Sequence, residues 1–166
     1  MRPDEPISRI MTEAVVVIEA DRPVSEVLDC FFQYPIHHLP VVRDQRLVGM
    51  LSSADLMKVE YFAPRGAADC AAFLDARFSI EQIMRAPVTS RGPATSLEEV
   101  ASLIMESGVH ALPVVDDDER VIGIVTTTDI IRSLLRGPPR RGTVGAEPIP
   151  AAPPQEDTPE SRFCHL

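Results

Sequence analysis

The chain has 166 residues, of which 45% are hydrophobic, and a formal net charge of −9. This length and composition allow one ordinary domain or two small ones with a packed core. The acidic balance argues against a nucleic-acid duplex as a partner, because neutralising phosphates requires clustered Lys and Arg.

A small anionic ligand remains compatible with this charge, because a local pocket need not share the sign of the whole chain. The start Met1–Pro6 lacks the apolar segment of a signal peptide, and no apolar run approaches the length that spans a bilayer. We therefore expect a cytoplasmic protein with no membrane partner.

The side chains that usually carry catalysis or bind metals are scattered along the chain. Cys30, Cys70 and Cys164 lie far apart and are expected to be free thiols. The cysteines and histidines show no metal-ligand spacing, and no cysteine falls within a recognisable site where a base could activate it. The sequence therefore predicts neither an enzyme nor a metal or cofactor site.

An internal repeat is the dominant feature of the chain. A shift of 73 positions places Leu39–Val42 on Leu112–Val115. After one additional residue in an acidic turn, a shift of 74 aligns three further pairs: Gly49 with Gly123, Asp55 with Asp129, and Lys58 with Arg132. Matches in this order are not chance.

The first repeat predicts a strand, a helix, two strands and a closing helix. The β-branched run Val15–Ile18 precedes apolar residues at helical spacing over Pro23–Gln33. Two short apolar strands follow, Leu39–Val42 and Leu47–Leu51, and the closing helix covers about Ser53–Val59.

The second repeat predicts the same order with clearer helix signals. Ser96–Glu99 is a capping box, and Gly108 ends the helix at the position that Pro35 occupies in the first repeat. Its closing helix is expected over Thr127–Leu135.

One repeat of this size buries too little surface to be stable alone, so we expect the two to pack as a pseudo-two-fold pair in a mixed α/β fold. The expected division of the chain is 1–60 for the first repeat, 61–78 for a helical connector, 79–136 for the second repeat, and 137–166 for a flexible, proline-rich tail.

Two motifs in the later half of each repeat carry a resemblance to a known family. Leu-Pro-Val-Val occurs twice, and each copy is followed by a glycine, an apolar strand, a hydroxyl residue and an aspartate, in Gly49–Asp55 and Gly123–Asp129. In this order and duplicated, these motifs resemble the CBS domain, and their tandem arrangement resembles a CBS pair over roughly residues 7–135. The resemblance implies a β-α-β-β-α repeat and, in some members of the family, a bound adenosine nucleotide.

The turns at Ser52-x-x-Asp55 and Thr126-x-x-Asp129 allow two interpretations. A strand that turns into a helix leaves N–H groups and the positive end of the helix dipole available to an anion, and a carboxylate can accept two hydrogen bonds from a ribose diol. Asp55 and Asp129 would then hold ribose, while Ser52 and Thr126 would hold ribose or the first phosphate. The alternative is an ordinary helix cap, worth about 1 kcal/mol, and both can hold at once.

The resemblance implies further contacts with the ligand. His37 and His110 occupy matching positions and would lie near the phosphates, where a histidine makes binding sensitive to pH near neutrality. Each site would take its ribose acid from one repeat and its first strand from the other. The residues expected to line the groove or contact adenine are Ile36, His38, Val109, Ala111, Val16, Val17, Pro87 and Val88.

The sequence and its resemblance to the CBS family together predict a stand-alone CBS pair that forms a homodimer, binds AMP, ADP, ATP or S-adenosylmethionine between its repeats and regulates an unknown protein. The Asp129 site is the stronger candidate, because Ser52 replaces threonine in the first repeat. The alternative is a structural or protein-interaction module without a nucleotide.

Overall fold

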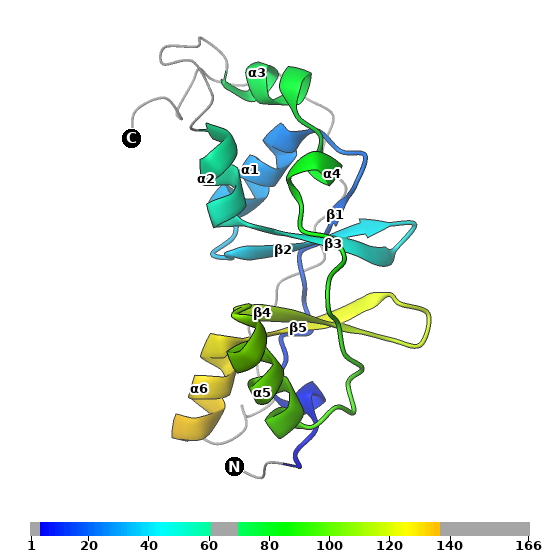
Figure 1. Ribbon diagram of the computed structural model, residues 1–166, viewed down its shortest axis with the longest axis vertical. Coiled ribbons are helices and arrows are strands. Elements are labelled where there is room, and N and C mark those ends of the chain that lie inside the picture. Colours follow the sequence, from blue (N-terminus) through cyan, green and yellow to red (C-terminus); the bar gives the residue numbers. More distant parts are fainter. Residues whose placement is uncertain (1–3, 61–69, 137–166) are drawn as a thin grey trace. The chain divides into compact units, whose positions relative to one another are not determined.

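The computed structural model describes residues 4–60 and 70–136, which form two compact units (Figure 1). The first-repeat unit contains residues 16–44, 48–60 and 70–87, and the second-repeat unit contains residues 4–15, 45–47 and 88–136. The expected tail, 137–166, lies outside the described residues.

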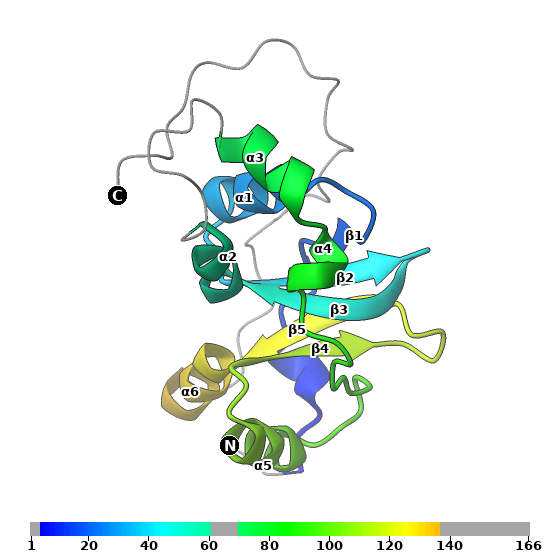
Figure 2. The same ribbon diagram turned by 45° about the horizontal axis from the view of Figure 1, so that its top comes forward.

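A three-stranded sheet forms the base of the first-repeat unit. Its strands lie in the order β1 (Ile18–Glu19), β2 (His38–Arg43) and β3 (Arg46–Ser52), with β1 parallel to β2. Both views show α1 (Val24–Gln33) and α2 (Ser53–Glu60) on the same face of this sheet (Figures 1 and 2). The apolar side chains of α1 and of the strands therefore meet in one core, which includes Val24, Val27, Leu39, Val41 and Leu51.

The helix that begins at Cys70 belongs to the same core. In α3 (Cys70–Arg77), Leu74 is fully buried, and so is Ile80 at the start of α4 (Ile80–Ile83). α1 begins after Pro23, which offers no side-chain cap. Asp75 of α3 takes this role, because its carboxylate accepts hydrogen bonds from the backbone N–H of Ser25 at 2.8 Å and from its hydroxyl at 2.7 Å.

The second-repeat unit places α5 (Leu97–Ser107) and α6 (Thr127–Arg136) on one face of the antiparallel pair β4 (Ala111–Val115) and β5 (Val121–Thr126). The predicted start and end of α5 are confirmed: the Ser96 hydroxyl accepts from the Glu99 N–H, and Gly108 has a left-handed φ of 66°. The core again comes from the inner faces of helices and strands, including Val100, Leu112, Val114 and Val125.

The first strand of the second repeat differs from the expectation. No strand is assigned around Val88, and the backbone of Arg91 forms a single parallel bridge with Val114 instead. In the first repeat, β1 is also shorter than the predicted run Val15–Ile18. The predicted mixed α/β class with two related repeats is nevertheless confirmed.

The start of each repeat packs in the unit that carries the other repeat's strands. In the second-repeat unit, Thr12 bridges to Ile124 of β5, after the short helix η1 (Ile7–Arg9). In the first-repeat unit, Arg85 forms the equivalent bridge to Met50 of β3, after α4. Each compact unit is therefore built from both repeats.

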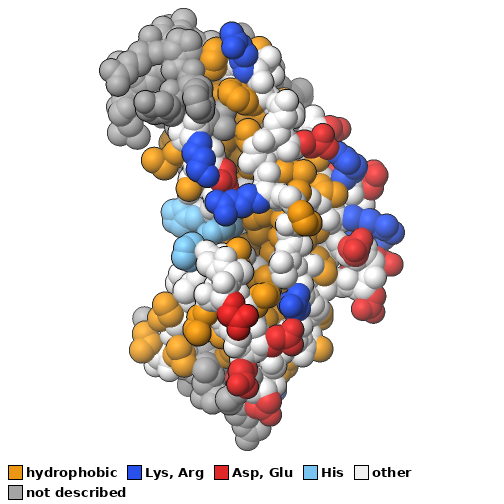
Figure 3. Space-filling model, in the orientation of Figure 1, with side chains coloured by type: hydrophobic (Ala, Val, Ile, Leu, Met, Phe, Trp, Pro, Cys, Tyr) orange, Lys and Arg blue, Asp and Glu red, His pale blue; other side chains and the backbone are white. Residues whose placement is uncertain are grey.

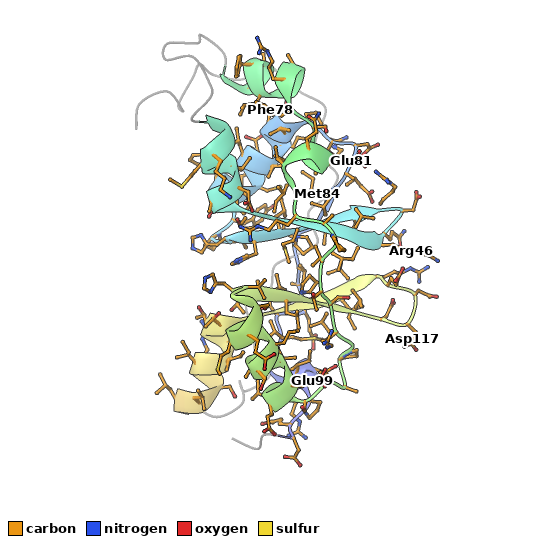
Figure 4. The ribbon with its side chains drawn as sticks, viewed as in Figure 1. Arg46, Phe78, Glu81, Met84, Glu99 and Asp117 are labelled. Carbon is orange, nitrogen blue, oxygen red and sulfur yellow. The ribbon has the colours of Figure 1, made fainter. Side chains whose placement is uncertain are left out.

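A methionine and a glycine make the same contact in each unit. Met84 lies against Gly49 of β3 so closely that a Cβ on the glycine would overlap its thioether (Figure 4). Met11 lies in the same way against Gly123 of β5. These glycines are thus required by close approach rather than by backbone conformation.

Among residues 4–60 and 70–136, the structure contains no helix with both the length and the apolar character needed to cross a membrane.

Substituting Gly49→Ala is expected to destabilise the protein by about 1–3 kcal/mol, because the added methyl group overpacks the contact with Met84. Urea unfolding of Gly49→Ala, Met84→Ala and the double variant would measure the coupling between the two positions. The double variant should lose less stability than the sum of the single losses. Strict additivity would contradict the contact.

Candidate functional site

The turn between β5 and α6 is held by reciprocal hydrogen bonds between Thr126 and Asp129. The Thr126 backbone N–H and hydroxyl donate to Asp129 Oδ2 at 2.9 and 2.6 Å. The Asp129 N–H in turn lies 3.2 Å from the Thr126 hydroxyl oxygen. This is the geometry of a capping box with aspartate as its acid, so the pair both ends the strand and begins the helix.

The first repeat has the matching two bonds to its aspartate between β3 and α2. The backbone N–H of Ser52 donates to Asp55 Oδ2 at 3.1 Å, and its hydroxyl donates to the same oxygen at 2.5 Å. Asp55 is 6% exposed and Asp129 is 8% exposed, so both carboxylates are buried. A buried carboxylate needs such donors to remain charged.

The second oxygen of each carboxylate accepts from a basic side chain one helical turn further on. Lys58 Nζ lies 3.1 Å from Asp55 Oδ1, and Arg132 Nη1 lies 2.9 Å from Asp129 Oδ1. Arg85 Nη2 adds a third group in the first-repeat unit, at 3.3 Å from Asp55 Oδ1. All three bases are exposed, whereas the acids that they contact are buried.

These contacts determine the charge of Asp55. Burial raises the pKa of its carboxyl group, but hydrogen bonds from Ser52, Lys58 and Arg85 outweigh this effect and lower the pKa below its ordinary value. Asp55 is therefore a carboxylate at neutral pH, able to accept hydrogen bonds and unable to donate them.

The two matching histidines adjoin these turns through their backbones. The His37 carbonyl accepts from the Ser53 N–H at 3.1 Å, and the His110 carbonyl accepts from the Thr127 N–H at 3.0 Å. Both imidazoles are exposed. Figure 3 shows histidine and basic side chains gathered near β2 and α2 in the first-repeat unit.

Four backbone amides at the two turns have partners within their own units. They are the N–H groups of Ser52, Ser53, Thr126 and Thr127. Each turn also offers a negative charge the positive end of a helix dipole and an exposed base.

The residues expected to line the groove differ in exposure. Ile36 and His38 are half-buried in the first-repeat unit, where Val16 is buried and Val17 and Pro87 are exposed. In the second-repeat unit, Val88 and Val109 are half-buried and Ala111 is buried. That each ligand site draws on both repeats stays a prediction.

Sequence reasoning missed two features of these turns. It aligned Lys58 with Arg132 but gave neither a partner, although acid and base three residues apart on a helix are neighbours. It gave no reason to connect Arg85 with Asp55, because the two lie thirty positions apart and Thr12 occupies the matching place in the other repeat.

No group of three or more Cys, His, Asp or Glu side chains suited to a metal ion occurs in the described part of the chain.

The model of the CBS domain family matches residues 7–61 and 80–136. The chain belongs to this family, and the two matches make it a protein with paired CBS domains.

Three proteins illustrate the likeness, one compared by sequence and two by structure. A homoserine O-acetyltransferase of Methanohalobium evestigatum is 34% identical over 127 residues, which are 76% of this chain and 23% of the relative. The chain thus spans less than a quarter of that protein, whose activity it need not share.

Two solved structures resemble nearly the whole described chain. A CBS domain pair in complex with 5′-methylthioadenosine and S-adenosyl-L-methionine is 27% identical, with a TM-score of 0.65, and covers 78% of this chain and 99% of its own. CBSX2 in complex with AMP is 26% identical, with a TM-score of 0.65, and covers 79% of this chain and 96% of its own. Both neighbours are complexes with adenosine-containing ligands.

The lowered pKa of Asp55 predicts a specific loss of stability in acid. Its contribution is present above the unfolded pKa of about 4 and is lost as the pH falls through the lower folded value. Melting temperatures measured from pH 6 downward through the acid range should fall less for Asp55→Asn than for wild type. An equal fall in the two proteins would show that Asp55 is not held in its charged form.

Proposed function

We propose that this chain is a non-catalytic regulatory module whose strand-to-helix turns bind an adenosine-containing ligand: AMP, ADP, ATP or S-adenosylmethionine. The observation that carries the proposal is that each repeat holds a buried carboxylate with one oxygen fixed by a cap and the other contacted by exposed bases. The adenosine ligands of the two similar structures support it.

The two carboxylate oxygens would have different tasks. Oδ2 of Asp129 accepts from both the N–H and the hydroxyl of Thr126, which fixes the plane of the carboxylate. Oδ1 accepts from Arg132, whose side chain is 53% exposed. Because the base is exposed while Asp129 is buried, ribose hydroxyls can replace its hydrogen bond at Oδ1, and the released base regains its hydration.

The displaced Lys58 or Arg132 side chain would remain close to the ligand. Lys58 and Arg132 lie one turn into α2 and α6, beside the acids that hold the ribose in this proposal. A phosphate attached to that ribose would meet a cation near the positive end of the helix dipole. The exposed imidazoles of His37 and His110 would add donors when protonated.

The adenine ring of the ligand would pack on small apolar side chains. Val16, Val17, Pro87 and Val88 and the segments Ile36–His38 and Val109–Ala111 supply aliphatic and backbone surface without an aromatic ring. Selectivity for adenine would therefore rest on backbone hydrogen bonds and shape rather than on stacking.

A second candidate function is that of a protein-interaction module, and the outer face of α6 favours it. Ile131, Leu134 and Leu135 are 50%, 56% and 79% exposed, and Met105 on α5 is 80% exposed. Apolar side chains grouped on one part of a surface are typical of an interface. We propose that this face pairs two copies of the chain, and that a ligand changes the affinity of the dimer for a regulated protein by binding its two conformations unequally.

Thermal unfolding with adenosine, AMP, ADP, ATP and S-adenosylmethionine tests the ligand proposal. A ligand that binds only the folded state, at a hundredfold excess over its Kd, adds roughly 2.7 kcal/mol, a rise of several degrees in melting temperature. The double variant Asp55→Asn/Asp129→Asn should lose this rise.

Asp75→Asn is the matched control, because it weakens the cap of α1 in the first-repeat unit without touching either turn. Its ligand-induced rise should equal that of wild type. If no adenosine ligand stabilises the wild-type protein, or if the double variant keeps the full rise, the proposal is wrong and the interaction module becomes the better account.

The dimer is tested separately by light scattering on the eluting protein. Wild type should have twice the mass of one chain, and Leu134→Glu should shift the mass toward one chain, because a charge cannot be buried there without a partner. Gln33→Glu adds the same charge at an exposed position in the other unit and should leave the mass unchanged. A monomeric wild type, or a dimeric Leu134→Glu variant, would contradict this interface.

A further inference from the structure

The two turns differ at one equivalent position, which Arg85 occupies in the first-repeat unit and Thr12 in the second. Arg85 exchanges backbone hydrogen bonds with Met50 of β3 at 2.9 and 3.1 Å. Thr12 exchanges the matching pair with Ile124 of β5 at 2.9 and 3.0 Å. The backbones are thus held alike, and only the side chains differ.

This difference changes the charge at each turn. Asp55 contacts two bases, Lys58 and Arg85, so one positive charge is in excess. Asp129 contacts Arg132, and the two charges balance. His38 also stands in the first repeat where Ala111 stands in the second. The first-repeat turn is therefore the more basic of the two.

We propose that Arg85 is a specificity-determining residue that makes the Asp55 turn select a nucleoside polyphosphate, whereas the Asp129 turn takes an adenosine ligand with less negative charge. This inference rests on the proposed adenosine ligand. It assigns different ligands to two turns that the repeat would suggest are equivalent.

The position of Arg85 suits this task. Its backbone is fixed by the bonds to Met50, yet its side chain is 65% exposed and pairs with Asp55, an acid that it shares with Lys58. When ribose hydroxyls occupy Asp55 Oδ1, both bases are released together beside the ligand. A guanidinium can then form paired hydrogen bonds with phosphate oxygens, which a threonine hydroxyl cannot.

Another arginine on this sheet is less suited. Arg43, at the end of β2, pairs with Glu81 of α4, so its charge is already compensated by an exposed acid. It offers a control in the same unit, since replacing it changes the net charge of the protein by the same amount as replacing Arg85.

Titration calorimetry with adenosine, AMP and ATP, in a background where the other turn is disabled, tests the inference. In Asp129→Asn, ATP should bind more tightly than adenosine, and adding Arg85→Thr should reduce that preference roughly tenfold, the usual weight of a hydrogen bond to a charged group. In Asp55→Asn, adding Thr12→Arg should raise the preference for ATP by a similar factor.

The controls separate failure of this inference from failure of the proposed function. Arg43→Thr should keep the ATP preference of its background, and Arg85→Lys should keep part of it. If adenosine binds but Arg85→Thr leaves the ratio of ATP to adenosine affinity unchanged, Arg85 does not select charge and only this inference falls. If adenosine binds in neither background, the proposed function falls as well.

Discussion

The fold and the candidate site both depend on the hydrogen bonds between a hydroxyl residue at the end of a strand and an aspartate three residues later. In the second repeat, Thr126 and Asp129 satisfy each other's backbone N–H groups, so these two donors stay paired where the chain leaves β5 and begins α6. The same bonds hold a carboxylate in a buried position with a known orientation. A residue pair that stabilises the fold thereby also prepares a hydrogen-bond acceptor for a ligand.

The close approach of methionine to glycine explains why neither repeat forms a compact unit by itself. Met84 and Met11 belong to the starting segments of the second and first repeats, and each packs on the glycine strand of the other. The same exchange brings Arg85 to Asp55, because the residue after Met84 bridges to β3 beside the glycine. A packing requirement of the core thus determines which charged group reaches each turn.

Much of the fold could be predicted from local patterns in the sequence. The N-cap at Ser96 and the glycine at 108 set the ends of α5, and the apolar runs around Leu-Pro-Val-Val set β2 and β4, because these signals act over a few residues. The exchange of starting segments could not be predicted, since it depends on contacts between residues distant in sequence. The short β1 and the missing strand near Val88 were also unpredictable, because β-branched runs form strands only where a partner edge is available.

For the site, the sequence correctly paired Ser52 with Asp55 and Thr126 with Asp129, because a spacing of three at a helix start has one common geometry. It left open whether the acids cap the helix or bind a ligand, and the structure shows that they do the first. We propose that each aspartate both caps its helix and binds the ligand. The most direct test is a titration of the labelled protein with adenosine, followed by the backbone amide NMR signals of Ser52 and Thr126. Saturable shifts of these signals, with smaller changes at the distant cap of Ser25, would agree with this account. Signals of Ser52 and Thr126 that do not move at saturating adenosine would contradict it.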